Sequence, residues 1–517
     1  MKTMKYILSS LALVAALSSC VKDLDVTPID PNKNTADKAL TTADDFNALL
    51  AGIYTGYATS GYYGPSGDPS ISGLDGGMSQ YVRGLFHLCE LSTDVYVCGW
   101  NDEGVPDVCK MNWDSSTGLI YSIYSRMFFQ IAQCNEFIRQ AKATSVSLPE
   151  KDEWIAEARA LRAMSYYHAI DNFGNVPFAD ESSVVGQIPR RITRADLYTW
   201  LENELTDIID NSALAERANT EYGRINKTAA KMILAKLYLN AEVYTGTAQW
   251  AKCANVLKDI MDDGYSLHTT SVGGVYSPYQ ELFLADNDQR TDEIIFSVES
   301  DGTDTQAYGV TTYLIFAFTG GTMAPADLGV SSGWAGCRMT PEFYDKFGAG
   351  DQRAIFWTDG QSKSVEEFGE FSNGYAFQKY KNVTSAGAPG SSEGFPDTDF
   401  PMFRYADVLL MAAECEAHGA AVDGYAGFNQ VRARAGLAAI ATPTLQQILD
   451  ERARELYLEL WRRQDLIRAD QFTTDAYIWQ WKGGVKDGKA VEDYKNLYPI
   501  PVSDMMVNPN LIQNEGY

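Results

Sequence analysis

The chain has 517 residues, of which 45% are hydrophobic, and its 42 Lys plus Arg against 68 Asp plus Glu give a formal net charge of -26. This length and apolar content suffice for a large hydrophobic core, whereas the charge disfavours nucleic acid as a partner. The four histidines show no zinc-binding spacing and no C-x-x-C is present, which disfavours a transition-metal enzyme.

The first 19 residues predict a secretory signal peptide. Lys2 and Lys5 precede an apolar stretch over residues 6–17, which is shorter than the roughly 20 apolar residues that span a bilayer. The sequence Leu-Ser-Ser-Cys at residues 17–20 resembles a lipoprotein cleavage site. We therefore expect Cys20 to be the lipidated first residue of the mature chain, held to a membrane by lipid alone; the alternative is an ordinary signal peptide with a chance cysteine.

A polar linker over residues 20–42 leads into a single domain predicted over residues 43–517. Its first strongly amphipathic helix covers residues 153–170, where Trp154, Ala158, Leu161 and Met164 recur at helical spacing. Residues 228–264 predict two helices separated by a short break at residues 245–247 and ended by a glycine.

The pattern returns near the C-terminus. Residues 404–437 predict a helical hairpin of 34 residues, the length of a tetratricopeptide unit. A further helix is predicted over residues 452–468, with Ala453, Leu456, Leu460 and Ile467 on one face. The fold class is therefore mainly α, a tetratricopeptide-type scaffold of repeated helices.

Two regions without helical periodicity, around residues 59–116 and 265–400, interrupt this scaffold. They contain tryptophans at positions 100, 113, 334 and 357, and disordered segments are poor in aromatic residues. We therefore expect long ordered loops, which commonly carry binding sites.

Seven cysteines remain after Cys20, which is not the pattern of a disulfide scaffold. One bridge among Cys89, Cys98 and Cys109 is compatible with an exported protein. Buried free thiols are an equal alternative, because sequence alone does not fix pairing.

Four stretches, "EARALRAMSYYHAIDNFGNVPF", "FPMFRYADVLLMAAECEA", "ARELYLELWRRQDLIR" and "YPIPVSDMMVNPNLIQNEGY", resemble the SusD/RagB family in this order along the mature chain. "YLNAEVYTG", "FTTDAYIWQWKGG" and "YPIPVSD" are most similar to its starch-binding members. The resemblance implies a lipid-anchored protein of the outer-membrane cell surface. It would capture a neutral glycan, with an α-glucan favoured, and pass it to a SusC-like TonB-dependent transporter, with no catalysis and no catalytic cofactor.

The resemblance also implies an arc of aromatic residues at Trp100, Tyr308 and Trp334. A sugar ring packs its C–H face on an aromatic plane, and stiff aromatic side chains lose little entropy on binding. Their flanking Gly, Ser, Asn and Asp residues favour exposure over core packing.

Polar groups are expected around this arc. Arg83 matches the family's rim arginine, a planar fork suited to two hydroxyl oxygens, and Asp75 is a weaker candidate. Glu103 stands where the family has an asparagine, with Asn101 nearby, so the resemblance does not fix the fine specificity. Asp288, Asp397 and Asp399 resemble family positions that bind a structural calcium ion, with the hard oxygen ligands calcium prefers.

Two other functions fit the composition. A surface glycoside hydrolase would need a pair of carboxylates, and the sequence nominates none. A tetratricopeptide adaptor that binds only proteins would leave the aromatic residues of the loops unexplained. The sequence therefore favours glycan binding without catalysis.

Overall fold

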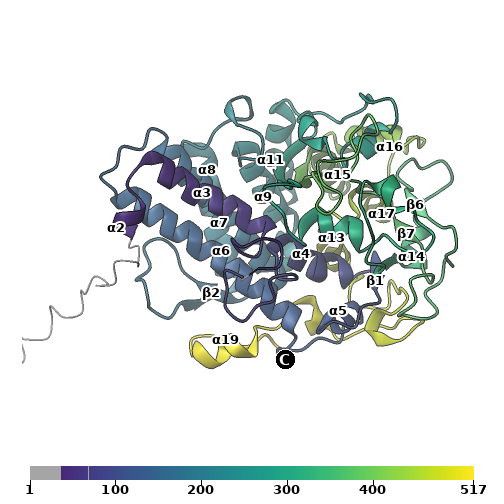
Figure 1. Ribbon diagram of the computed structural model, residues 1–517, viewed down its shortest axis with the longest axis horizontal. Coiled ribbons are helices and arrows are strands. Elements are labelled where there is room, and N and C mark those ends of the chain that lie inside the picture. Colours follow the sequence, from purple (N-terminus) through teal and green to yellow (C-terminus); the bar gives the residue numbers. More distant parts are fainter. Residues whose placement is uncertain (1–35, 68) are drawn as a thin grey trace, which may run out of the picture.

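The computed structural model describes residues 36–67 and 69–517 (Figure 1). The predicted signal peptide and Cys20 lie outside the described residues. No described helix combines the length and the apolar character needed to cross a membrane.

The long helices of the scaffold pack one on the next in chain order: α6 (Gly118–Ala143) on α7 (Lys151–Asn172), α7 on α8 (Arg194–Asn211), α8 on α9 (Lys227–Leu239), α9 on α11 (Trp250–Asp262), α11 on α15 (Tyr405–Ala417) and α15 on α16 (Gly424–Arg434). In Figure 1, α3 (Ala43–Ala58) lies along α6 and α7, both of which it contacts. The other helices outside the irregular regions are α2 (Ala36–Ala39), α10 (Ala241–Thr245), α17 (Leu445–Leu456), α18 (Arg462–Arg468) and α19 (Val502–Val507).

Polar side chains cap the N-termini of several of these helices. Thr42 and Thr444 form capping boxes with Asp45 and Gln447, and Asn226 accepts from the backbone of Ala229 at the start of α9. α15 and α16 form the predicted helical hairpin, which begins one residue after its expected start and ends three residues before its expected end. The mainly α, repeat-type scaffold is thereby confirmed.

Two helices predicted as continuous are broken. The helix expected from residue 228 ends at Leu239 and resumes as α10, because the Asn240 amide turns back to the carbonyl of Lys236. The helix expected over residues 452–468 stops at Leu456, where Leu458 and Leu460 adopt positive φ. The backbone N–H of Leu460 donates to the buried Glu90 at 2.7 Å, so a tertiary contact overrides the helical periodicity.

The two regions expected to be irregular contain short elements. These are α4 (Tyr81–Phe86), a π-helical turn η1 (His87–Leu91), α5 (Val105–Cys109), α12 (Pro278–Glu281), α13 (Val310–Phe316), α14 (Pro341–Tyr344) and the 3₁₀ turns η3 (Asn287–Gln289) and η4 (Pro325–Leu328). Further 3₁₀ turns, η2 (Arg217–Asn219), η5 (Lys482–Gly484) and η6 (Asp493–Asn496), lie elsewhere along the chain. Every residue of α4 and α13 is buried. These helices have no exposed polar face, so amphipathic periodicity does not reveal them in the sequence.

Short strands fasten these regions together in antiparallel pairs. The pairs are β1 (Tyr96–Cys98) with β5 (Cys337–Met339), β2 (Val176–Phe178) with β3 (Arg190–Ile192), β4 (Ile294–Val298) with β8 (Phe400–Arg404), and β6 (Phe356–Trp357) with β7 (Ala376–Phe377). β1 and β5 come from different irregular regions. Their pairing joins segments that lie more than 200 residues apart in sequence.

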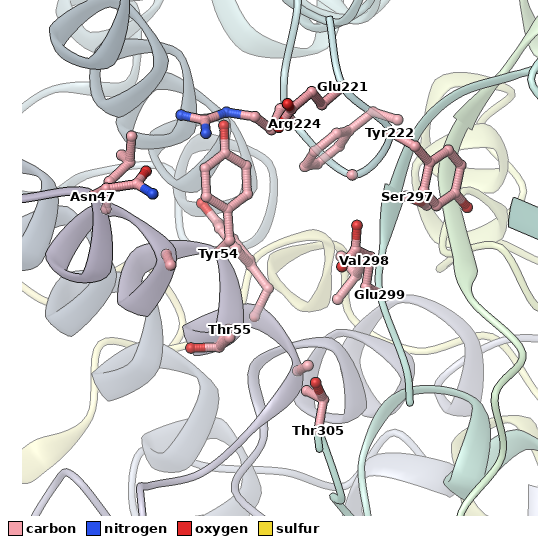
Figure 2. Close-up of a pocket in the computed structure, with 16 residues that line it drawn as sticks. Asn47, Tyr54, Thr55, Glu221, Tyr222, Arg224, Ser297, Val298, Glu299 and Thr305 are labelled. Carbon is pink, nitrogen blue, oxygen red and sulfur yellow. The ribbon is translucent and has the colours of Figure 1, made fainter. Parts of the chain in front are cut away.

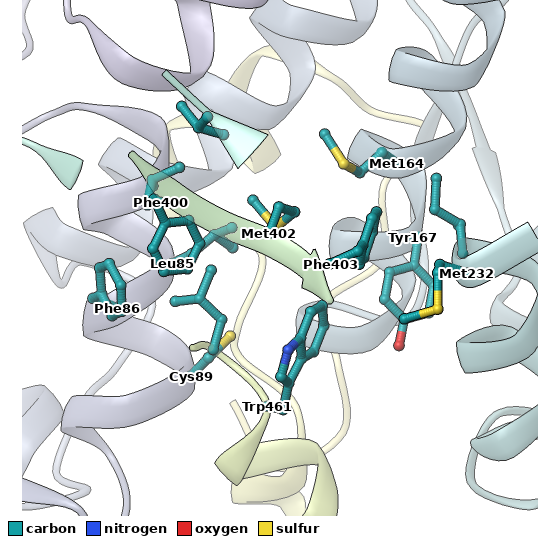
Figure 3. Close-up of a cluster of buried hydrophobic side chains, with 14 of the residues drawn as sticks. Leu85, Phe86, Cys89, Met164, Tyr167, Met232, Phe400, Met402, Phe403 and Trp461 are labelled. Atoms are coloured by element: carbon teal, nitrogen blue, oxygen red, sulfur yellow. The ribbon is translucent and has the colours of Figure 1, made fainter. Parts of the chain in front are cut away.

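The core continues from the scaffold into the loop-rich half. Figure 3 shows the junction, where side chains from α4, α7, α9 and β8 meet around Trp461. The labelled members are Leu85, Phe86, Cys89, Met164, Tyr167, Met232, Phe400, Met402, Phe403 and Trp461. This shared core fixes the loops on the helices.

A buried network of charges lies beside this junction. Arg404 donates to Glu459 at 2.6 Å and to Glu293 and Glu455 at 2.8 and 2.6 Å, and Arg353 also reaches Glu455 at 3.1 Å. The arginines hold the pKa of Glu455 well below its usual range against the cost of burial. A buried network of this kind is costly to break once formed.

Candidate functional site

Trp100, Tyr308 and Trp334 come together in the structure, and we call them the aromatic platform. The ring centroids of Trp100 and Trp334 lie 6.2 Å apart at 54°, and those of Tyr308 and Trp334 lie 5.9 Å apart at 68°. All three side chains are partly exposed. The three rings are therefore neighbours in the structure, and each is partly exposed.

The β1–β5 pair positions Trp100. Trp100 follows β1 by two residues, and the backbone N–H of Gly99 donates to Gly336 at 2.9 Å. The indole lies flat against Gly336, where an added Cβ would be 2.1 Å from Cε2 of Trp100. The indole N–H donates to the carbonyl of Trp334 at 3.3 Å. Only glycine at position 336 therefore leaves room for this ring.

The end of α13 positions Trp334. Its backbone N–H donates to the carbonyl of Phe316 at 2.7 Å, and its ring packs on that phenylalanine with a centroid separation of 5.2 Å. Ala335 and Val310 hold positive φ of 50° and 47° on either side of the platform. Such backbone conformations cost of order 1–3 kcal/mol and persist only where surrounding structure enforces them.

Arg83 lies beneath the platform rather than on an open rim, with 5% of its surface exposed. Its Nη1 donates to the carbonyls of Gly77 and Tyr308, both at 3.0 Å, and its guanidinium lies 4.8 Å from the ring centroid of Tyr313 and 5.9 Å from that of Trp334. Burial lowers its pKa. Arg83 therefore ties the Gly77 loop to Tyr308, which corrects the expectation of a freely exposed fork.

The other polar candidates are exposed. The Asp75 carboxylate accepts from the backbone of Gly77 at 2.8 Å, and a Cβ on Gly77 would lie 3.3 Å from that oxygen and 3.9 Å from the Tyr308 ring. Asp75 is thus beside the platform. Asn101 and Glu103 follow Trp100 on the surface, and the Glu103 carboxylate lies near Gly118 at the start of α6.

The structure adds an aromatic residue that the sequence reading missed. The ring of Phe395 lies 5.5 Å from that of Tyr308 at 39° and is partly exposed. It extends the platform beyond Tyr308. The signal was present in its Gly-Phe-Pro setting, which favours an exposed loop.

The expected calcium site is not formed by its candidates. Among the described residues, no group of three or more His, Cys, Asp or Glu side chains is placed to hold a metal ion. Asp397 instead accepts from Gly302 and Ser391, and Asp399 accepts from Ser300 and Tyr222, each of the latter at 2.7 Å. Burial raises the pKa of Asp399 to about 7. Asp288 is exposed on the η3 turn, and its negative charge and that of Glu299 add to the raised pKa of Asp399.

A cavity of about 240 Å³ lies between α3, β4 and the loop over residues 221–224. Figure 2 shows Tyr54 and Tyr222 across its opening, with Glu299 below them. None of the aromatic platform residues lines this cavity. We place the candidate site at the platform, because that surface unites aromatic rings with exposed polar groups.

Comparisons with known proteins agree with this architecture. The model of the SusD family matches residues 361–517. The chain is 34% identical to the starch-binding protein SusD of Bacteroides thetaiotaomicron, with all of both chains covered, and 24% identical to SusD-like protein P2 of Formosa agariphila, covering 99% of this chain and 100% of that one.

A solved structure shares the fold. Surface glycan-binding protein A from Bacteroides thetaiotaomicron, in complex with laminarihexaose, superposes with a TM-score of 0.70 at 20% identity, over 92% of this chain and 100% of that one. The full-length identity to a curated relative, the family match and the helical scaffold lead to one assignment. The chain belongs to the SusD family.

Proposed function

We propose that this protein binds a neutral glycan on the aromatic platform and does not cleave it. The observation that carries the proposal is the convergence of three partly exposed rings from separate loops, tilted at 54° and 68° to one another. Sugar rings pack on aromatic faces, and rings held rigidly in advance bind at a smaller entropic cost. The relatives named for starch or glycan binding support the same reading.

An α-glucan is the favoured ligand. Tilted rings suit a curved chain better than a flat ribbon, and the relative with 34% identity is named as starch-binding. The solved neighbour in complex with laminarihexaose makes that sugar the necessary competitor.

Isothermal titration calorimetry with maltohexaose, laminarihexaose and cellohexaose tests the choice. We expect the tightest binding to maltohexaose. Preference for laminarihexaose would retain glycan binding and reject the α-glucan assignment, whereas no binding to any glycan on a broad array would reject the proposal.

Catalysis is the second function to test. Incubation with maltohexaose for a day, followed by measurement of reducing ends, should show no increase over a protein-free control. New reducing ends that disappear in the Trp334→Ala variant would show that the platform feeds a hydrolytic site.

We also propose delivery of the glycan to a SusC-like TonB-dependent transporter, with the protein anchored at the outer-membrane surface through lipid on Cys20. The support is membership of the SusD family and the lipobox-like residues 17–20. Co-purification of a β-barrel transporter from outer membranes in mild detergent tests this step. A protein that is always recovered alone would contradict it.

A further inference from the structure

Cys98 and Cys337 face each other across the β1–β5 pair, directly behind the aromatic platform. They are Cα partners in the antiparallel register, between the pairs Val97–Arg338 and Gly99–Gly336. Both side chains are buried, at 1% and 0% exposure. This pairing was not among those considered from the sequence, because Cys337 belongs to the other irregular region.

The geometry of the strand pair suits a covalent bond. Residues directly opposite in an antiparallel pair have side chains on the same face and Cα atoms about 4.5–5.5 Å apart, and a disulfide needs about 4.4–6.8 Å. The pKa of Cys98 is raised mainly by burial and secondly by the neighbouring Cys337 thiol. Both thiols are free in this structure and stand opposite each other in the strand register.

The other cysteines have different surroundings. The Cys89 thiol donates to the Asn172 side chain at 3.7 Å, which directs it toward α7. The pKa of Cys109 is raised by burial and also responds to Cys98, so Cys109 is the competing partner. Cys253 and Cys415 lie together at the contact of α11 and α15, away from the platform, and supply a matched control pair.

We propose that Cys98 and Cys337 form a disulfide bond as the exported chain folds. The reaction is thiol–disulfide exchange with a disulfide-bearing oxidant of an oxidising compartment: the two S–H bonds break, one S–S bond forms, and the oxidant departs as two thiols carrying the hydrogens. The bond forms during folding because both thiols are sealed from solvent afterwards. The inference requires export, and it does not require that the platform bind a glycan.

The bond would brace the platform. Cys98 lies two residues before Trp100, and Cys337 lies three residues after Trp334. A covalent link between these strands fixes the separation of the two indoles, which leaves less ordering for a ligand to impose. We expect the reduced form of the same chain to melt roughly 3–5 °C lower and, if the platform binds glucan, to bind it roughly two- to tenfold more weakly.

Peptide mapping tests the bond directly. Full-length protein from its native outer membrane is denatured with N-ethylmaleimide, digested with trypsin and glutamyl endopeptidase without reductant, and analysed by mass spectrometry. Cleavage after Glu90 and Glu103 places Cys89, Cys98 and Cys109 on separate peptides, 84–90, 91–103 and 104–110, and Cys337 on 300–338. We expect peptides 91–103 and 300–338 to be linked and to separate with dithiothreitol.

Two cysteine variants test which residues form the link. Cys98→Ala should abolish the linked pair, whereas Cys253→Ala should leave it unchanged. The proposal would be overturned if denatured wild-type protein carried N-ethylmaleimide on both Cys98 and Cys337. A disulfide link between Cys98 and Cys109 would also overturn it. Refolding the reduced wild-type chain with oxidised glutathione provides a second measurement, and failure to form the same linked peptides there also counts against it. Loss of glucan binding with the linked peptides intact would refute the proposed function alone.

Discussion

Replacing Trp334 by alanine should weaken binding of maltohexaose without unfolding the protein. The indole packs on Phe316 and lies near the Arg83 guanidinium, and it remains partly exposed. A sugar ring that covers roughly 40–80 Å² of apolar surface contributes about 1–2 kcal/mol, and aromatic packing adds about 0.5–1 kcal/mol. Loss of both contributions, about 1.5–3 kcal/mol together, corresponds to an increase in Kd of about 10- to 150-fold.

Calorimetry and thermal melting on the same samples separate binding from folding. Trp334 contributes to packing at the end of α13, so we expect some destabilisation, but less than the roughly 3–5 kcal/mol for removing a fully buried tryptophan. Trp113→Ala is the matched core control, because Trp113 is 2% exposed and donates to Tyr517. That variant should lose stability and keep its affinity while folded.

A third tryptophan controls for nonspecific effects. Trp250 is partly exposed on α11, where it stacks on His418 at 3.9 Å. Trp250→Ala should leave affinity unchanged. Unchanged affinity in Trp334→Ala, or an equal loss in Trp250→Ala, would refute the platform as the binding surface.

Three further predictions concern the lipid anchor at Cys20, the buried carboxyl of Asp399 and the charge network around Arg404. Cys20→Ala should release the protein from membranes, as fractionation would show; persistent membrane association without its transporter would contradict lipid anchoring. Because burial raises the pKa of Asp399 to about 7 while an unfolded aspartate titrates near about 4, the folded state retains this proton longer, and stability should fall by up to about 4 kcal/mol from pH 4 to 7. Asp399→Asn should flatten this part of the profile in denaturant titrations, and an unchanged profile would exclude Asp399 as its source. Arg404→Met should cost about 3–5 kcal/mol of unfolding free energy, because Glu293, Glu455 and Glu459 would lose a shared cation; a loss below about 1 kcal/mol in the same titrations would show that water or other arginines compensate.

Local sequence patterns account for the helical scaffold. Apolar residues at helical spacing placed α7, α11, α15 and α16 close to their observed ends, because these helices bury one stripe against their neighbours in chain order. The sequence also identified Trp100, Tyr308 and Trp334 as candidate site residues, through their polar flanks and the family resemblance.

The arrangement of the loops depends on contacts between segments far apart in the chain. The break after Leu456 depends on Glu90, which lies far away in sequence, and helical periodicity carries no information about such a partner. Likewise, Arg83 donates to the carbonyl of Tyr308 and lies near the ring of Trp334. The ring of Phe395 lies beside that of Tyr308, and Cys98 stands opposite Cys337 in the strand pair. Each of these relations joins segments distant in sequence, so it exists only once the chain has folded.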